Sequence, residues 1–293
     1  MQQLGKYAYA ETAYDWANVG TVLTDAGAVL IDCPVRPSDS AHWQQVVRGL
    51  HPRGARYLIA TDYHGDHIAG TSFIDGIGDT VNFLAPQVAY DEIKKGGNAF
   101  SKKIFVETLN DLGHTEEAKT LTDAVVPAPT YCWEETMVLH LEPLTFNIKR
   151  MGGHSPGTSA VFIPEEGIIF SSDVVVNTGG GGGGGMRDAH LGDWIKALEW
   201  IEKLPVQTII PGHGDVCGMD LVRLQRQRMV DVLGSVSELV KKGFTKDETV
   251  TDASLERRFF QADASRGEYW MKQRQESFRE GIARVYDEVR ETI

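Results

Sequence analysis

Long apolar runs, paired cysteines and dense basic segments are all missing from this chain of 293 residues. A membrane-spanning helix needs about 18 or more consecutive apolar residues, and no run reaches that length. Residues 1–6 do not show the basic start and apolar stretch of a secretory signal. The cysteines, Cys33, Cys132 and Cys217, are odd in number and widely spaced, which argues against a disulfide framework. These absences predict a cytoplasmic protein with no membrane partner.

The charge balance is acidic. The net charge is −12, and no dense run of lysine and arginine interrupts it. A nucleic-acid backbone would be repelled by such a surface unless a local basic patch compensated. We therefore expect a small-molecule substrate and no nucleic-acid partner. The sequence does not indicate an oligomeric state.

Apolar, β-branched runs alternate with helical segments along the first two thirds of the chain. Hairpins are predicted for residues 19–23 with 28–31, 136–141 with 144–148, and 160–163 with 167–170. Single strands are predicted at 57–60, 80–84 and 208–210, and helices at 40–50, 87–95, 194–204, 221–242 and 265–290. In this reading Asp193 caps the helix that begins at Trp194. Residues 96–126, polar and weakly periodic, are expected to be an insertion of loops and a short helix, a candidate lid or wall over a site.

Seven consecutive glycines occupy residues 179–185. Such a run has maximal backbone freedom and no side chains to pack. It reads either as a flexible surface linker that replaces a natural loop or as a mobile flap. It is not a nucleotide motif, because it lacks the spaced glycines of a strand–turn–helix unit. A Gly-x-Ser-x-Gly nucleophile motif is also absent.

Side chains that bind metal ions gather in one short segment and return at three later places. The segment is Asp62-Tyr63-His64-Gly65-Asp66-His67. The candidate ligands are Asp62, His64, Asp66, His67, His154, Asp173 and His213.

Each of the three distant candidates, His154, Asp173 and His213, follows an apolar run that reads as a strand. Strand ends hold ligands on a rigid scaffold, and the glycines beside two of them allow close backbone approach. Imidazole and carboxylate ligands suit zinc, and the carboxylates also suit iron or manganese.

This arrangement resembles the metallo-β-lactamase-fold hydrolases, whose signature is His-x-His-x-Asp-His followed by a distant His, an Asp and a last His. The resemblance extends from about residue 19 to residue 218 and is strongest at 61–70, 152–158, 170–173 and 211–214. It implies an α/β fold, a four-layer αββα sandwich, with a helical C-terminal extension. We expect a catalytic domain over residues 1–218 and a helical segment over 219–293, packed on the same domain.

The resemblance also assigns the metal ligands. Asp62, His64 and His154 would form a first site, and Asp66, His67 and His213 a second. Asp173 would bridge two divalent ions, zinc being expected and iron or manganese being alternatives. Asp62 stands where the family usually has its first histidine, which leaves a single-metal enzyme using the second site as an alternative.

The expected activity is hydrolysis of a small ester, lactone, thioester or β-lactam by a metal-bound hydroxide, with Asp66 accepting or relaying a proton. One alternative is a diiron protein of redox or oxygen chemistry. Another is a non-catalytic relative that uses the fold for binding.

Several further residues are candidates for the surroundings of the site. Asp32 ends an apolar strand and reads either as an acceptor that orients a ligand histidine or as a strand-end residue. Cys217, four residues after His213, reads either as a small buried residue or as a residue that approaches the metals. The candidates for the pocket lining are Tyr63, Arg187, His190 and Trp194.

Overall fold

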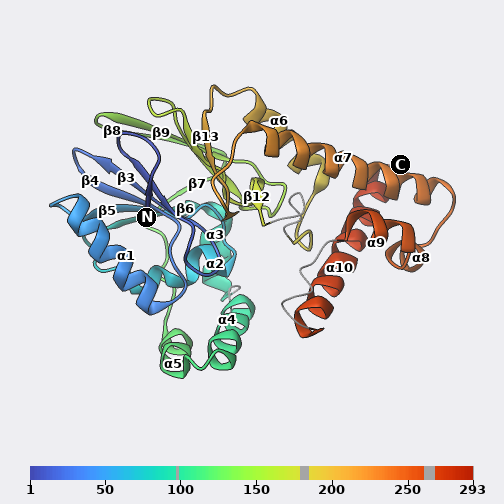
Figure 1. Ribbon diagram of the computed structural model, residues 1–293, viewed down its shortest axis with the longest axis horizontal. Coiled ribbons are helices and arrows are strands. Elements are labelled where there is room, and N and C mark those ends of the chain that lie inside the picture. Colours follow the sequence, from blue (N-terminus) through green and yellow to red (C-terminus); the bar gives the residue numbers. More distant parts are fainter. Residues whose placement is uncertain (97–98, 179–184, 261–267, 293) are drawn as a thin grey trace.

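Two β-sheets lie face to face, and helices cover both outer sides (Figure 1). This arrangement is seen in a computed structural model that describes residues 1–96, 99–178, 185–260 and 268–292. All but the last of the seven glycines lie outside the described residues, so both interpretations of that run stay open.

The larger sheet is antiparallel in its first half and parallel in its second. Its strands are, in spatial order, β1 (Gln2–Gln3), β2 (Ala8–Glu11), β3 (Val19–Thr24), β4 (Gly27–Ile31), β5 (Ala55–Ile59), β6 (Asn82–Pro86) and β7 (Tyr131–Trp133). The second sheet has the order β13 (Thr208–Ile210), β11 (Ile168–Phe170), β10 (Ser159–Ile163), β9 (Leu144–Arg150) and β8 (Thr136–Leu141). A small parallel pair joins β12 (Val176–Asn177) to β14 (His213–Gly214).

The helices follow the strands in chain order. They are α1 (Pro37–Leu50), α2 (Gly65–Ile68), α3 (Gln87–Lys95), α4 (Ala99–Asp111), α5 (Thr115–Asp123), α6 (Leu191–Glu202), α7 (Met219–Lys241), α8 (Lys246–Val250), α9 (Ala253–Phe259) and α10 (Glu268–Thr292). Two short 3-10 helices complete the elements: η1 (Ala69–Phe73) follows α2, and η2 (Ser172–Val174) follows β11.

Alternating side chains on the central strands produce the layers. In β4, Ala28 and Leu30 point to the cluster beneath α1, whereas Val29 and Ile31 point to the cluster between the sheets. The period of two residues along a strand requires this division when both faces are covered. On the outer side, the buried Trp43 indole of α1 donates a hydrogen bond to Thr21 Oγ1 at 3.0 Å. The four-layer αββα prediction is confirmed.

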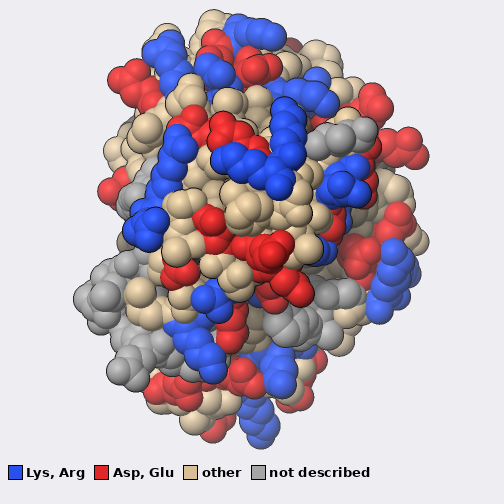
Figure 2. Space-filling model, turned by 90° about the vertical axis from the view of Figure 1, so that its right-hand side faces the viewer, with Lys and Arg blue, Asp and Glu red and all other residues tan. Residues whose placement is uncertain are grey.

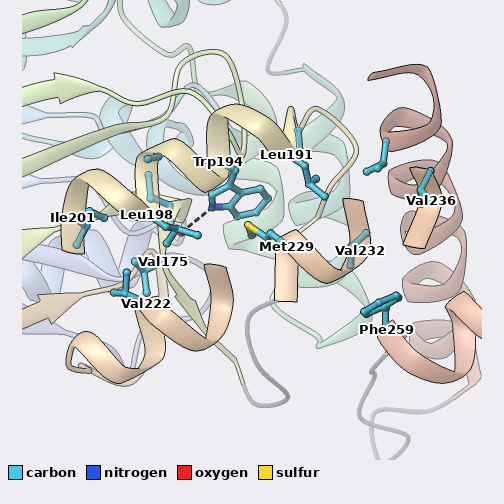
Figure 3. Close-up of a cluster of buried hydrophobic side chains, with 14 of the residues drawn as sticks. Val175, Leu191, Trp194, Leu198, Ile201, Val222, Met229, Val232, Val236 and Phe259 are labelled. Atoms are coloured by element: carbon cyan, nitrogen blue, oxygen red, sulfur yellow. Dashed lines mark hydrogen bonds between the residues drawn. The ribbon is translucent and has the colours of Figure 1, made fainter. Parts of the chain in front are cut away.

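The opposite outer layer is built around Trp194 of α6. Its indole nitrogen donates to the carbonyl of Val174 at 2.8 Å, shown as a dashed line in Figure 3. The surrounding apolar cluster draws Leu198 from α6, Met229 from α7 and Phe259 from α9 (Figure 3). The C-terminal helices therefore share one core with the second sheet. The domain boundary at residue 218 stays a prediction.

Two sequence predictions differ from the structure. Residues 96–126 contain the two helices α4 and α5, which are longer than the short helix expected, and Leu109 and Leu121 of these helices are fully buried. The second difference concerns Asp193, which does not cap α6. His190 is the cap, because its Nδ1 accepts from the Asp193 amide at 3.2 Å and the helix begins three residues earlier than predicted.

None of the helices in the described parts of the chain combines the length and the hydropathy that a membrane crossing requires.

Glu288 of α10 joins the C-terminal helix to the start of α6. Its carboxylate, 7% exposed as a residue, accepts the amides of Leu191 and Gly192, each at 2.7 Å. Both amides belong to the first turn of α6, where the helix offers them no partner. A negative charge at this end also favours the helix dipole.

Glu288→Ala is expected to lower the free energy of unfolding by about 1–3 kcal/mol, because it leaves two largely buried amides without an acceptor. Urea denaturation measures the change. Glu291→Ala, on the exposed side of the same helix, is the matched control and should unfold like the unmodified protein. Equal stability of the two variants would contradict the prediction.

Candidate metal centre

All seven predicted ligands lie on segments that follow strands of the two sheets. Asp62 and His64 follow β5, while Asp66 and His67 stand on the short helix α2 directly after them. The other three, His154, Asp173 and His213, occupy the β9–β10 connection, η2 after β11, and β14 after β13, respectively. The structure brings these segments together into two neighbouring groups.

In the second group, Asp66, His67 and His213 each offer one ligand atom, and these atoms lie within 4.8 Å of one another. His213 Nε2 is 3.2 Å from Asp66 Oδ2. In the first group, Asp62, His64 and His154 meet the same limit, and His64 Nδ1 is 3.2 Å from His154 Nε2.

Asp173 lies between the two groups. Its Oδ2 is 3.2 Å from His154 Nε2, in the first group. Its Oδ1 is 3.3 Å from His213 Nε2 and 3.5 Å from His67 Nε2, in the second. The carboxylate therefore faces both groups with different oxygens, which is the position predicted for a bridging ligand.

The ligand atoms have the spacing of a metal site. Tetrahedral zinc holds nitrogen and oxygen ligands at about 2.0–2.1 Å, which places neighbouring ligand atoms about 3.3 Å apart. The distances around Asp173 lie between 3.2 and 3.5 Å. His67 Nε2 and Asp173 Oδ1 are also buried without a hydrogen-bond partner. A buried polar atom rarely stays unpaired, so these residues fit a divalent ion.

The second group is held from behind by the buried Asp32 and by the backbone of Trp16. Asp32 Oδ2 lies 2.9 Å from His67 Nδ1, and the same carboxylate accepts from the amide and hydroxyl of Thr61. The carbonyl of Trp16 lies 2.9 Å from His213 Nδ1. Asp32 and Trp16 both adopt positive φ, at 57° and 72°, a strained conformation that persists where the surroundings enforce it. Both contacts leave Nε2 of the histidine facing the centre.

Asp62 is surrounded by donors. The side chain of Ser155 donates to its carboxylate, at 2.8 Å from Oδ1 and 2.9 Å from Oδ2. Thr158 Oγ1 also donates to Oδ2, and the amide of Tyr63 donates to Oδ1 at 2.7 Å. Asp62 is fully buried. Its oxygens are thus already satisfied by the protein, unlike the unpaired atoms of the second group.

Two glycines permit the close approach of the ligand loops. A Cβ on Gly212, beside His213, would lie 1.9 Å from Asp173 Oδ1. A Cβ on Gly153 would lie 2.6 Å from the Cα of Trp194, and Gly153 has a φ of +86° that other residues rarely adopt.

Charges in the centre are strongly coupled. Burial disfavours a charged His213, but carboxylates, Asp173 foremost, outweigh burial and raise the pKa of His213 to about 10. Burial also disfavours a charged His64, but the surrounding carboxylates, Asp62 foremost and then Asp188, raise its pKa to about 9. Burial would raise the pKa of Asp173, yet the surrounding histidines hold it well below its usual range. Burial lowers the pKa of His154.

The residues that were candidates for the surroundings of the site differ in their distance from the ligands. The ring of Trp194 packs edge-on against His154 with centroids 5.2 Å apart, and Tyr63 lies 4.9 Å from His64 in the same way. Cys217 contacts the apolar cluster around α6, and burial raises the pKa of its thiol to about 11. It stands outside both ligand groups.

Sequence reasoning missed four residues that touch the ligands: Trp16, Ser155, Thr158 and Asp188. Ser155 and Thr158 stand within the family-like segment after His154, so their position carried a signal. Asp188 lies 3.1 Å from His64 Nε2 although 124 positions separate them, and 197 positions separate Trp16 from His213. No local pattern indicates such pairs.

Comparison with known proteins identifies the family. The Metallo-beta-lactamase superfamily matches the chain over residues 17–213. The chain belongs to this superfamily. A "Metallo-beta-lactamase type 2" from Bacteroides fragilis is 21% identical over 223 residues, which cover 74% of this chain and 76% of that protein. Membership in the superfamily indicates a metal-dependent hydrolase at the level of the family.

Solved structures of the superfamily share the fold. A metallo-beta-lactamase from Pontibacter korlensis superposes with a TM-score of 0.63 at 15% identity, covering 78% of this chain and 98% of its own. The DIM-1 metallo-beta-lactamase gives 0.62 at 16% identity, with 78% and 96% covered. The family match ends at residue 213, before α7.

Metal binding to these histidines is expected to release protons. At pH 7 the rings of His64 and His213 are cationic, with a proton on each nitrogen, because their pKa values are raised to about 9 and about 10. A metal ion displaces one proton from each ring. Zinc added to the metal-free protein should therefore release at least two protons, and its affinity should rise with pH. Calorimetry in two buffers of different ionisation enthalpy measures the number of protons released when zinc binds. Release of none would contradict the prediction.

Proposed function

We propose that this protein is a hydrolase with two divalent metal ions that cleaves a small ester, lactone, thioester or β-lactam-like substrate. The observation that carries the proposal is Asp173, a buried carboxylate whose two oxygens face two separate groups of candidate ligands. A purely structural cluster does not require His67 Nε2 and Asp173 Oδ1 to be unpaired.

The proposed ligands form two sets, one for each metal ion. The first ion is assigned to Asp62, His64 and His154, the second to Asp66, His67 and His213, with Asp173 shared. Zinc suits this set of imidazoles and carboxylates, and iron or manganese are the alternatives.

The protein contributes orientation and proton transfer. Bound divalent ions would supply a water of lowered pKa and polarise the oxygen of the substrate's scissile group. Asp66 is the proposed acceptor of the proton that the attacking water loses. Its side chain is 22% exposed and lies beside His213, so it is reachable from solvent. Asp32 and Trp16 keep the rings of His67 and His213 turned toward the centre.

The two sites are proposed to be unequal. Hydrogen bonds from Ser155, Thr158 and the Tyr63 amide engage the Asp62 carboxylate, so a metal ion must compete with them. The atoms of the second site have no such competitors. The second site therefore fills first, and an enzyme with that ion alone is the runner-up.

A small-molecule substrate agrees with the distribution of charge. On the face shown in Figure 2, Lys and Arg side chains are interspersed with Asp and Glu, and the described residues there form no continuous basic surface. The absence of a nucleic-acid partner and the cytoplasmic location remain predictions.

Metal binding should occur in two steps. Zinc titration of the chelator-treated protein is expected to show one tight equivalent and a second that is at least about tenfold weaker. Asp62→Ala should abolish the second equivalent and preserve the first. A variant that still binds both with unchanged affinity would remove Asp62 from the ligand set.

Metal content and oxygen uptake, measured on the protein as purified, separate the alternative functions. Iron together with oxygen uptake in the protein as purified would support the diiron redox hypothesis. No retained or added metal would support a non-catalytic binding relative.

Hydrolysis of a panel of chromogenic esters, lactones, thioesters and cephalosporins tests the reaction. We expect turnover of at least one class that a chelator stops and zinc restores. Asp66→Asn should lower kcat by about 10²–10⁴-fold, the range for loss of a positioned proton acceptor. Asp79→Asn, an exposed carboxylate elsewhere on the surface, is the control. Metal-independent turnover would contradict the proposal.

A further inference from the structure

His64 uses its two ring nitrogens in different directions. Its Nδ1 faces His154 Nε2 at 3.2 Å, on the side of the first ligand group. Its Nε2 lies 3.1 Å from Asp188 Oδ2, on the other side of the ring. An acceptor at Nε2 favours the tautomer that carries its proton there, and Nδ1 is then free to bind a metal ion.

The three other ligand histidines differ in whether an acceptor contacts the ring nitrogen that faces away from the metal centre. His67 and His213 each have an acceptor behind the ring, Asp32 and the Trp16 carbonyl. His154 has none, because its Nδ1 is buried without a partner. Asp188 is therefore the one side chain of the described structure with a hydrogen-bond contact to the outer nitrogen of a first-group histidine.

Asp188 belongs to a short segment, residues 185–190, that is tied down on two sides. Arg187 pairs with Glu280 of α10 at 2.6 Å, and a Cβ on Gly281 would lie 2.7 Å from Met186 Cβ. On the other side, the amide of His190 donates to the carbonyl of Gly153 at 2.8 Å. The segment thus spans from α10 to the loop that carries His154.

We propose that Asp188 is a positioning residue of the first metal site, which accepts the Nε2 proton of His64 and presents Nδ1 to the ion. Glu280 of α10 supports it through Arg187. The C-terminal helix thereby takes part in forming the site. This inference rests on the proposed function, because it assumes that His64 binds metal.

The test compares metal affinities in Asp188 variants. Loss of a residue that orients a metal ligand typically costs about 10–100-fold in affinity. Asp188→Ala is expected to weaken the second, weaker zinc equivalent by that factor and to leave the tight one unchanged. Asp188→Asn keeps an acceptor oxygen and should retain most of the affinity. Glu280→Ala should fall between them, and Asp79→Ala should match the unmodified protein.

Nitrogen-15 NMR of the histidine rings provides a readout that a general loss of stability would not produce. In the zinc-loaded protein, His64 should show a slowly exchanging Nε2 proton, and Asp188→Ala should lose it. Thermal unfolding of the metal-free variant should be close to that of the unmodified protein, since the Asp188 side chain is 46% exposed.

The outcomes separate this inference from the proposed function. An Asp188→Ala protein that binds both equivalents normally, or loses both equally, would overturn the role of Asp188 while the hydrolase proposal stands. An unmodified protein that binds no zinc would overturn both.

Discussion

The centre depends on one buried carboxylate. Asp173 has a side chain that is 5% exposed, and it lies against His67, His154 and His213. Burying a charge is costly unless opposite charges or metal ions compensate it. Three loops from different strands must therefore converge on η2, and Gly212 must lack a side chain for His213 to arrive. Each sheet supplies part of the cluster, and the apolar side chains packed between the two sheets bring these loops together.

The hydrogen-bond partners that orient the ligand side chains differ between the two groups, and this difference indicates how the two metal sites differ. The second group rests on Asp32, which is buried, and on the backbone of Trp16, and both residues adopt a strained positive φ. The first group contains Asp62, already satisfied by hydroxyl groups, and a histidine oriented by the half-exposed Asp188. Rigid buried partners preorganise a site more strongly than exposed ones. A tight site beside an adjustable one is the physical consequence.

The C-terminal helices extend this dependence beyond the residues that the superfamily matches. Glu288 of α10 holds the first turn of α6, and Trp194 of the same helix packs on the ring of His154. Glu280 of α10 holds Arg187 beside Asp188. Helix α10 thus contacts both α6 and Arg187, which flank the first ligand group, and its removal would expose part of the apolar cluster around α6.

Sequence by itself determined the family, the layered fold and the seven candidate ligands, because metal-ligand types and strand patterns are local and recur in order. It did not determine the helices of residues 96–126. Their sequence periodicity is weak, and the helices are stabilised by tertiary contacts that bury Leu109 and Leu121. It offered both a structural and an orienting reading for Asp32, and only the 2.9 Å contact with His67 separated them. The tertiary structure alone revealed Asp188, since a hydrogen bond between segments 124 positions apart depends on how α10 and the loops pack.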